Sequence, residues 1–486
     1  MKLMSSSNPV TNLDRSPGRL VLAVVVLIGI FHAVTLRDGH EWGGDFAQYI
    51  VHAGNLAEGR SYAETGIIYN PHNIVLGPRA YPPGFPVLLA PFYAGFGANL
   101  HVFKLVQIGL LCVTLFLLPR LFPDLSRTQQ LLLIVLAGMN PLMWISRDAI
   151  QSEHLFVPLW HLSLFWGTAC IQKDRAGSVG GIVLGLLVFA TCQTRTAGIV
   201  LLPALIVADL IWRRRLSRIV LTAIAAVIGL TVLQKLMMPD TGSGYVEQLR
   251  RISIDSLTYN VRQNLSALSQ IFDNGHSSAV RRLMMTVTMV IAVVGVVIHN
   301  RPRIRLIGIA SLFYVALVTV WPTAAGLRIV MPLVPVFLFY VVVGLKTCSE
   351  KLGQPLTPVF VVLILASFVG HYSAADYSSI DDGPNRATAQ ELFETIRATT
   401  SPDDVFLFFK PRVLRLYAGR RAAAFPEADS GVDWKEWASE INANFVVVRS
   451  DAHAQSLAYM HESRDPQPEG VMVFQNRDFR MFRLRP

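Results

Sequence analysis

The sequence predicts an α-helical polytopic membrane protein with about eleven transmembrane helices and a small soluble α/β domain at its C-terminal end. Three observations predict this class. The 486 residues are 52% hydrophobic and only 16% charged, which is far more apolar surface than a soluble core of this length needs. Apolar runs long enough to cross about 30 Å of hydrocarbon recur along the chain. The basic residues gather in the short loops between those runs.

The first apolar run follows a polar tail, residues 1–18, which is expected to be cytoplasmic. Lys2, Arg15 and Arg19 precede the run, as they would in a cleaved signal, but no small-residue cleavage site follows it. We therefore expect a retained anchor. The expected membrane-spanning runs lie near residues 19–36, 100–119, 129–146, 152–171, 178–194, 196–212, 217–236, 283–299, 306–321, 328–345 and 357–373.

The charged loops predict the orientation, because basic loops stay on the cytoplasmic side. With the N-terminus inside, every inner loop carries Arg or Lys, and an odd number of crossings places the C-terminal region outside. Asp209 lies four residues before Arg213, a spacing that predicts a helical ion pair without a functional role. The basic residues of the inner loops are Arg120, Arg127, Lys173, Arg175, Arg213, Arg214, Arg215, Arg218, Arg301, Arg303, Arg305, Lys346 and Lys351.

The formal net charge of +10 does not indicate a nucleic-acid partner. Nucleic-acid binding needs a basic face on a folded domain, whereas these cations are spread over short loops. The four cysteines, Cys112, Cys170, Cys192 and Cys348, lie in or beside apolar runs and share no metal-ligand spacing. Neither a disulfide framework nor a cysteine metal site is expected from them.

From about residue 376 the long apolar runs give way to short β-rich runs separated by helical stretches. This alternation is typical of a small α/β domain, expected over residues 376–486. The β-rich runs are 405–409, 445–449, 471–475 and 479–484, and the helical stretches include 388–399 and 434–441.

Two loops on the expected outer side are too long to be simple connectors. The first, residues 37–99, holds a further apolar stretch at 85–96 and is too rich in aromatic residues to be disordered. The second, residues 239–282, has apolar residues at helical spacing from Ile254 to Ile271. That spacing predicts an amphipathic helix lying on the membrane surface.

Four stretches, taken in order, resemble the C-type (GT-C) glycosyltransferases, which include the protein O-mannosyltransferases and the lipid A aminoarabinose transferases. The resemblance covers about residues 15–345 and depends on order and topological placement, since no single stretch is a specific signature. The stretches are Gly44-Asp45-Phe46-Ala47-Gln48-Tyr49 in the first outer loop, Tyr81-Pro82-Pro83-Gly84 before a membrane-hugging helix, Asn140-Pro141 leading to Ser152-Glu153-His154-Leu155-Phe156, and Arg328 ahead of Met331-Pro332-Leu333-Val334-Pro335.

The resemblance implies a catalytic membrane domain over residues 19–375. Such an enzyme moves a sugar from a polyprenyl-phosphate carrier to a lipid, glycan or protein acceptor, with inversion, on the outer face of a bacterial inner membrane. The chemistry needs a carboxylate to deprotonate the attacking hydroxyl and cations to hold the departing phosphate. In the protein O-mannosyltransferases an Asp-Glu pair stands at this position, whereas Phe46 follows Asp45 here. Their acceptor and metal dependence therefore do not carry over.

Three carboxylates are candidate catalytic residues. Asp45, just outside the first helix, is the expected base, although an aspartate there is otherwise a solvated residue or a helix cap. Glu153 and Asp148 lie at the expected outer boundary, where a second carboxylate could assist acceptor or metal binding. Asp148 could equally form an interfacial pair with Arg147. Glu153, inside an apolar helix, is the costlier to bury and hence the better functional candidate. Whether Asp45 and Glu153 hold a divalent cation stays open at this point.

Arginine and aromatic residues are the candidate substrate-binding groups. Arg195 and Arg328 lie in outer turns and are expected to hold the carrier phosphate with bidentate hydrogen bonds; contact with lipid headgroups is the alternative. Tyr49 and Tyr81 belong to the resembling stretches and are expected at the substrate. His154 is a weaker candidate, because a lone histidine is more often a hydrogen-bonded packing residue than a metal ligand.

Other classes of membrane protein fit the sequence less well. A secondary transporter should show internal symmetry and polar helices near the bilayer midplane. An O-antigen ligase or polymerase would also use a lipid carrier, but it places its large outer loop late in the chain. A scaffold without catalytic activity would leave the carboxylates and arginines of the outer boundary unexplained.

Overall fold

The computed structural model describes residues 18–73, 77, 80–173, 177–238, 253–301, 304–321, 326–427, 430–449 and 470–484. Contacts between residues divide the chain into two compact units. Unit 1 comprises Met1–Leu36, Lys104–Gln234 and Ile252–Tyr377, and unit 2 comprises Arg37–Phe103, Lys235–Arg251 and Ser378–Pro486.

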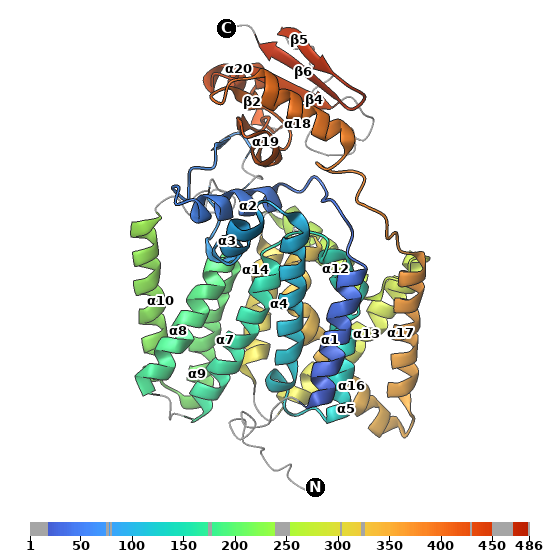
Figure 1. The fold of residues 1–486 in the computed structure, drawn as a ribbon. Coiled ribbons are helices and arrows are strands. Elements are labelled where there is room, and N and C mark those ends of the chain that lie inside the picture. The colour runs from blue at the N-terminus through green and yellow to red at the C-terminus, as the bar shows by residue number, and fades with distance from the viewer. Residues whose placement is uncertain are drawn as a thin grey trace. The chain divides into compact units, whose positions relative to one another are not determined.

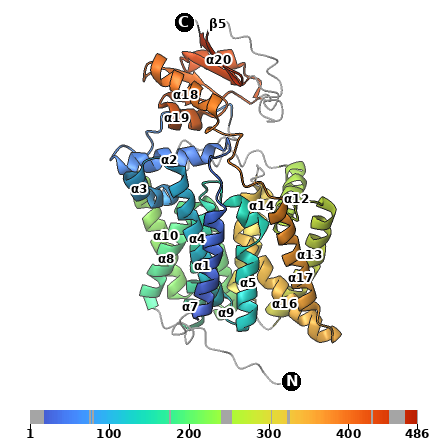
Figure 2. The same ribbon diagram turned by 45° about the vertical axis from the view of Figure 1, so that its right-hand side comes forward.

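Unit 1 is a bundle of apolar helices that run side by side in both ribbon views (Figures 1 and 2). Among the described residues, eight helices are long and apolar enough to cross a membrane. They are α4 (Leu100–Leu121), α7 (Glu153–Lys173), α8 (Gly177–Thr194), η2 with α9 (Thr196–Val200, Leu201–Arg213), α10 (Arg218–Met237), α13 (Ser278–Asn300), α15 with η5 and α16 (Leu327–Val330, Met331–Leu333, Val334–Leu352) and α17 (Leu356–Ala374). Three shorter apolar helices are α1 (Arg19–Val34), α14 (Leu306–Val320) and α3 (Gly84–Phe96), the last in unit 2.

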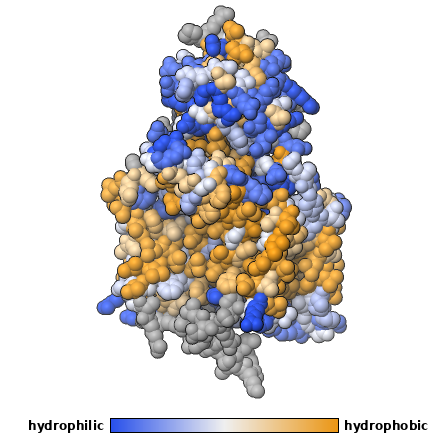
Figure 3. Space-filling view, in the orientation of Figure 1, coloured by the Kyte–Doolittle hydropathy of each residue, from blue (hydrophilic) through white to orange (hydrophobic). Residues whose placement is uncertain are grey.

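The surface of unit 1 confirms that lipid is its main solvent. Large apolar side chains along α10, α13 and α17 are exposed, among them Leu233, Val290 and Val369. In the space-filling view the face of this unit that is turned to the viewer is mostly hydrophobic (Figure 3). Contiguous apolar surface of this extent is not tolerated in water, so the chain is an integral membrane protein. Helix α16, by contrast, is buried along most of its length.

The eight long helices, together with α1 and α14, coincide with ten of the eleven expected runs. The run at 129–146 is different, because it is broken into α5 (Arg127–Gly138) and α6 (Pro141–Ser146). Proline disfavours helical geometry in the residue before it, and Asn140 is extended there, with φ −73° and ψ 150°. The Asn140 side chain accepts a hydrogen bond from the Met143 amide at 3.1 Å and so caps α6.

Two glycines allow helices α13 and α16 to pack closely against each other. A Cβ atom at Gly295 of α13 would collide with the carbonyl oxygen of Tyr340, and one at Gly344 of α16 would collide with that of Ile291. Only glycine permits this backbone-to-backbone contact. Small residues serve the same purpose in other membrane helix pairs, where close packing replaces the hydrophobic effect.

The two ends of the bundle differ in chemistry. Helix α7 runs from Glu153, at one end, to Lys173 at the other. Near its C-terminal end the carbonyl of Ile171 accepts a hydrogen bond from Arg213 Nε at 2.9 Å. Arg213 also pairs with Asp209 at 3.5 Å, which confirms the expected helical ion pair. Trp212 Nε1 donates to the carbonyl of Ile304 at 2.8 Å, so the basic loop after α13 lies at this end as well, as the positive-inside pattern predicts.

In the described part of the chain, unit 2 contains a six-stranded sheet in the order β1-β3-β2-β4-β6-β5. The first four strands are parallel, and β4-β6-β5 pair antiparallel. Its strands are β1 (Ile67–Ile68), β2 (Val405–Leu407), β3 (Arg421–Ala423), β4 (Phe445–Arg449), β5 (Gly470–Gln475) and β6 (Phe479–Leu484), and its helices are α2 (Gly44–Ala57), α3, α18 (Ala387–Thr399), α19 (Pro411–Ala418) and α20 (Trp434–Glu440). The expected C-terminal α/β fold is thereby confirmed.

Strand β1 comes from the first outer loop, which the sequence did not predict. Ile67 and Ile68 pair in parallel with Ala422 and Ala423 of β3. Beside this pairing, the Asn70 side chain donates to the carbonyl of Ala424 at 2.9 Å. The first outer loop and the C-terminal region thus form one folded unit.

The second outer loop contains the expected amphipathic helix, α12 (Ile254–Ser269), in unit 1. Ser253 begins the helix as one half of a capping box with Ser256. Asn260 fastens α12 to the end of α14, since its side chain donates to the carbonyl of Thr319 at 3.0 Å. The residues 239–252 that precede α12 lie outside the described part of the chain.

Candidate functional site

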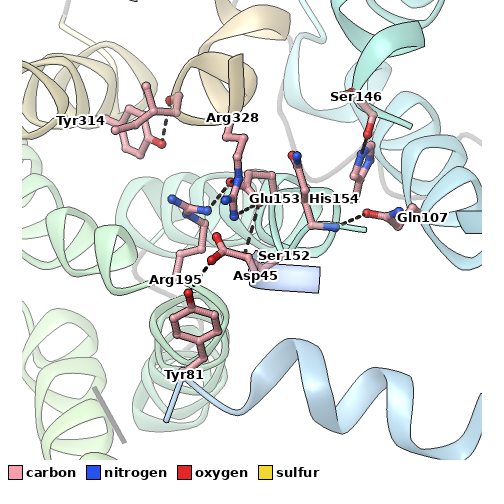
Figure 4. Close-up of polar contacts among 12 residues, drawn as sticks. Asp45, Tyr81, Gln107, Ser146, Ser152, Glu153, His154, Arg195, Tyr314 and Arg328 are labelled. Atoms are coloured by element: carbon pink, nitrogen blue, oxygen red, sulfur yellow. Dashed lines mark hydrogen bonds and ion pairs between the residues drawn. The ribbon is translucent and has the colours of Figure 1, made fainter. Parts of the chain in front are cut away.

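In unit 1 the buried carboxylate of Glu153 binds two arginines. Arg328 Nε donates to Glu153 Oε1 at 2.6 Å, and Arg328 Nη2 donates to Oε2 at 3.3 Å. Arg195 Nη1 donates to the same Oε1 (Figure 4). The sequence separations are 42 and 175 residues. The structure thus unites three of the predicted site residues in one cluster.

The local backbone conformation positions each residue of this cluster. Glu153 is the first residue of α7, where the helix dipole favours an acidic side chain. Arg195 is extended between α8 and η2, with φ −148°. Arg328 is the second residue of α15. This helix begins directly after Gly326, whose φ of 56° and ψ of −134° are readily adopted only by glycine.

The carboxylate and the two guanidinium groups of the cluster differ in solvent exposure. The Glu153 side chain is fully buried, whereas those of Arg195 and Arg328 are 21% and 24% exposed. The carboxylate therefore holds the guanidinium groups from the interior. Their exposed edges are suited to an anion, because a planar guanidinium binds phosphate through paired hydrogen bonds.

An aromatic layer lies next to Glu153 along α7. Phe156 and Trp160 are buried one and two turns further on, and the Trp160 ring meets Tyr314 of α14 edge to face at 5.3 Å. The Tyr314 hydroxyl donates to the carbonyl of Ile329 in α15 at 3.0 Å. This contact fastens the short helix that carries Arg328.

Asp148 and His154 lie in a second group of contacts, around Arg147. The Arg147 guanidinium stacks on Trp144 at 4.2 Å, donates to the carbonyl of Thr35, and lies 3.8 Å from Asp148. The ring of His154 contacts the carbonyl of Ser146 at 3.3 Å (Figure 4). These bonds join α1, α6 and α7.

In unit 2, Asp45 is bound by Tyr81 and by an arginine of the C-terminal region. The Tyr81 hydroxyl donates to Asp45 Oδ1 at 2.5 Å (Figure 4). Arg412 Nη1 donates to the same oxygen at 2.9 Å and to the Tyr81 hydroxyl at 2.6 Å. Tyr49 completes this side of the site, since its ring lies 5.1 Å from that of Tyr81.

Two helix beginnings meet at Asp45. Asp45 is in the first turn of α2, and Arg412 is in the first turn of α19, directly after Pro411. A Cβ atom at Gly44 would lie 3.4 Å from Arg412 Cδ, which is an ordinary van der Waals contact. Burial lowers the pKa of Lys410, which precedes α19, although the charge of Asp45 opposes that shift.

His52 orients the backbone of Tyr81. Its Nδ1 bonds the carbonyl of Tyr62 at 2.9 Å, and its Nε2 accepts the Tyr81 amide at 3.3 Å. This pattern requires the neutral tautomer with the proton on Nδ1. Burial lowers the pKa of His52 to about 4, against an ordinary value of 6.5.

No three His, Cys, Asp or Glu side chains gather as metal ligands among the described residues. Asp45 and Glu153 belong to different units, and each has arginine partners inside its own unit. A cation held by both carboxylates therefore stays a proposal.

Sequence reasoning missed Arg412. It lies in the segment Lys410-Pro411-Arg412, between a β run and a helix of the C-terminal domain. Basic residues at such a position are usually solvated. Only the burial of its side chain, which is 6% exposed, distinguishes it.

No protein-family model and no curated protein matches the sequence. Solved structures match in fold. The chain is similar to ArnT from Cupriavidus metallidurans bound to undecaprenyl phosphate, with a TM-score of 0.58, 14% identity, and coverage of 96% of this chain and 97% of that one.

It is also similar to the oligosaccharyltransferase AglB from Archaeoglobus fulgidus in complex with an inhibitory peptide and a dolichol-phosphate. There the TM-score is 0.58 and the identity 10%, over 88% of this chain and 69% of that one. Both neighbours are GT-C proteins. The chain therefore has the GT-C fold, as its motifs indicate.

Proposed function

We propose that the protein is a membrane glycosyltransferase that moves a sugar from a polyprenyl-phosphate carrier to an acceptor. The observation that carries this proposal is the fold shared with ArnT over nearly the whole of both chains, in a structure bound to undecaprenyl phosphate. The Glu153 cluster supports it, because its two guanidinium groups are suited to a phosphate.

In the proposed reaction Asp45 is the general base. The acceptor hydroxyl gives its proton to the Asp45 carboxylate while its oxygen bonds to the anomeric carbon of the sugar. The bond from that carbon to the carrier phosphate breaks, and the phosphate leaves with the electron pair. Attack from the face opposite the phosphate inverts the anomeric carbon.

Arg195 and Arg328 are proposed to hold the phosphate as its charge grows during bond cleavage. Glu153 then acts as a positioning residue, since it holds both guanidinium groups and is itself buried. We assign Tyr49 and Tyr81 to the acceptor side, next to Asp45. The contacts of Asp148 and His154 favour a structural role for both.

The proposed active face is the outer face of the membrane, in a bacterial inner membrane. Support comes from the charge asymmetry of unit 1: Glu153 lies at the end of α7 opposite the basic loops. The acceptor is proposed to be a lipid, glycan or protein.

Purified protein incubated with a panel of radiolabelled polyprenyl-phosphate sugars tests the function. Release of free carrier together with labelled acceptor is the expected result. Movement of intact lipid-linked sugar across proteoliposomes without bond cleavage would instead identify a transporter. Transfer of a whole lipid-linked glycan, with no use of single sugars, would identify a ligase or polymerase.

A further inference from the structure

Asp45 and the C-terminal domain are joined by a polar contact that spans 367 residues of sequence. Two donors, the Tyr81 hydroxyl and Arg412 Nη1, share one carboxylate oxygen, Oδ1. They also bond to each other at 2.6 Å. The three groups form a closed triangle, which fixes the plane of the carboxylate more firmly than a single ion pair does.

Arg412 is a buried member of this triangle. Its side chain is 6% exposed, against 30% for Asp45. A buried guanidinium needs partners that satisfy its charge and its donors. Here Asp45 supplies charge, and the ring of Tyr81 lies 5.0 Å from the guanidinium carbon, within cation–π range.

We propose that Arg412 is a positioning residue for the catalytic carboxylate, so that the C-terminal domain completes the active site. This inference depends on the proposed function in one respect, the role of Asp45 as base. Arg412 favours the ionised carboxylate, because an opposite charge within a few ångströms stabilises it. Together with Tyr81 it aims that carboxylate, and Arg412 itself does not touch the acceptor.

Several charged or titratable groups of unit 2 bear on this arrangement. Tyr81 and Arg412 contact Asp45 directly, and Lys410 lies within electrostatic range of it. Glu41 and Arg449 act in turn on Lys410. The other groups are the same in wild type and in Arg412→Gln. A difference in the titration of Asp45 between these two proteins therefore reports on Arg412.

The first experiment measures the carboxylate without enzyme activity. A water-soluble carbodiimide labels protonated carboxyl groups, and mass spectrometry of the full-length protein follows labelling of Asp45 against pH. Arg412→Gln is expected to raise the midpoint by roughly one pH unit, whereas Arg412→Lys keeps the charge and restores it. If the substitution changed only the access of the reagent to Asp45, the labelling rate would change by the same factor at every pH, and the midpoint of the labelling curve would stay the same.

Arg415→Gln is the matched control. Arg415 lies on the same helix, but it donates to the carbonyl of Gly419 at the helix end. A midpoint for Arg412→Gln equal to that of Arg415→Gln would overturn the proposal. If the glutamine variant does not fold, Tyr81→Phe removes the other donor while keeping the ring, and the same upward movement is expected.

The second experiment compares pH–activity profiles of the same variants. Arg412→Gln is expected to shift the acid limb upward, in parallel with the labelling midpoint. A labelling shift without activity in any variant, wild type included, would count against the proposed function and leave the positioning role standing. If Arg412→Gln had an unchanged labelling midpoint and full transfer activity, the positioning role of Arg412 would be refuted and the proposed function would stand.

Discussion

At Asp45, both contacts identified in unit 2 fall on one carboxylate oxygen, and this constrains what the residue can do. A carboxylate bound by Tyr81 and Arg412 has a set orientation. General-base catalysis depends on geometry first and proton affinity second. The contribution of Asp45 can therefore be isolated by a substitution that keeps its shape.

Asp45→Asn removes the proton acceptor and preserves the size of the side chain. Turnover with saturating donor is expected to fall by about a hundredfold or more, while folding and donor binding persist. The control is Asp38→Asn, because Asp38 is in the same unit and its side chain is 83% exposed. Near-normal transfer by Asp45→Asn would show that Asp45 is not the base.

Arg328 is expected to act on binding. Its guanidinium would meet a phosphate that is charged already in the ground state, so Arg328→Ala should weaken donor binding about tenfold or more. Arg328→Lys should recover part of this affinity. Equilibrium binding of a labelled carrier phosphate measures the effect, with the exposed Arg282→Ala as control. Equal affinities in Arg328→Ala and the control would exclude a phosphate contact.

His52 makes stability depend on pH. Its folded pKa is lowered to about 4 from 6.5, so the unfolded chain binds a proton first as pH falls. The neutral residue therefore contributes full stability above about pH 6.5, and up to about 3 kcal/mol is lost by about pH 4. His52→Gln should flatten the unfolding temperature across this window, whereas the exposed His276→Gln should not. Parallel curves for wild type and His52→Gln would refute the linkage.

At the scale of elements, the interrupted run 129–146 shows how one dipeptide overrides hydropathy. Hydropathy predicts one uninterrupted apolar run there, yet Asn140-Pro141 ends one helix and caps the next. Arg147 then follows the short helix α6 and donates to the carbonyl of Thr35, beyond the end of α1. The break therefore positions polar groups at the Glu153 end of the bundle.

The α13–α16 contact predicts a stability effect. Gly344→Ala would place a methyl group against the carbonyl of Ile291, and separating the two helices should cost about 2 kcal/mol or more. Gly229→Ala is the control, because a Cβ there meets nothing within 4 Å. Thermal unfolding in detergent compares the two variants. Equal stabilities would mean that the helices separate without cost.

At the scale of the whole molecule, the charge pattern predicts that the C-terminal domain lies outside the membrane and the basic loops lie inside. A cysteine at Ser430 should react with an impermeant reagent added from outside, because reversing the orientation would expose every basic inner loop. Reaction only after permeabilisation would reverse the orientation and move the proposed active face. A cysteine in the basic loop at Arg215 is the control, expected to react only after permeabilisation.

The sequence by itself determined the membrane class, ten of the helices, the amphipathic α12 and the C-terminal α/β fold. These features follow from hydropathy, helical spacing and turn residues, which are local properties of the chain. It also singled out Asp45, Glu153, Arg195 and Arg328, because of their motifs and places at helix ends.

Only the tertiary structure decided which of these residues are partners. Glu153 meets Arg195 and Arg328 across 42 and 175 residues, and Asp45 meets Arg412 across 367. Strand β1 joins a sheet formed otherwise by the C-terminal region. A two-residue strand and a buried arginine leave no periodic pattern in the sequence. Their positions depend on packing between distant segments, whereas hydropathy and spacing report only on neighbours along the chain.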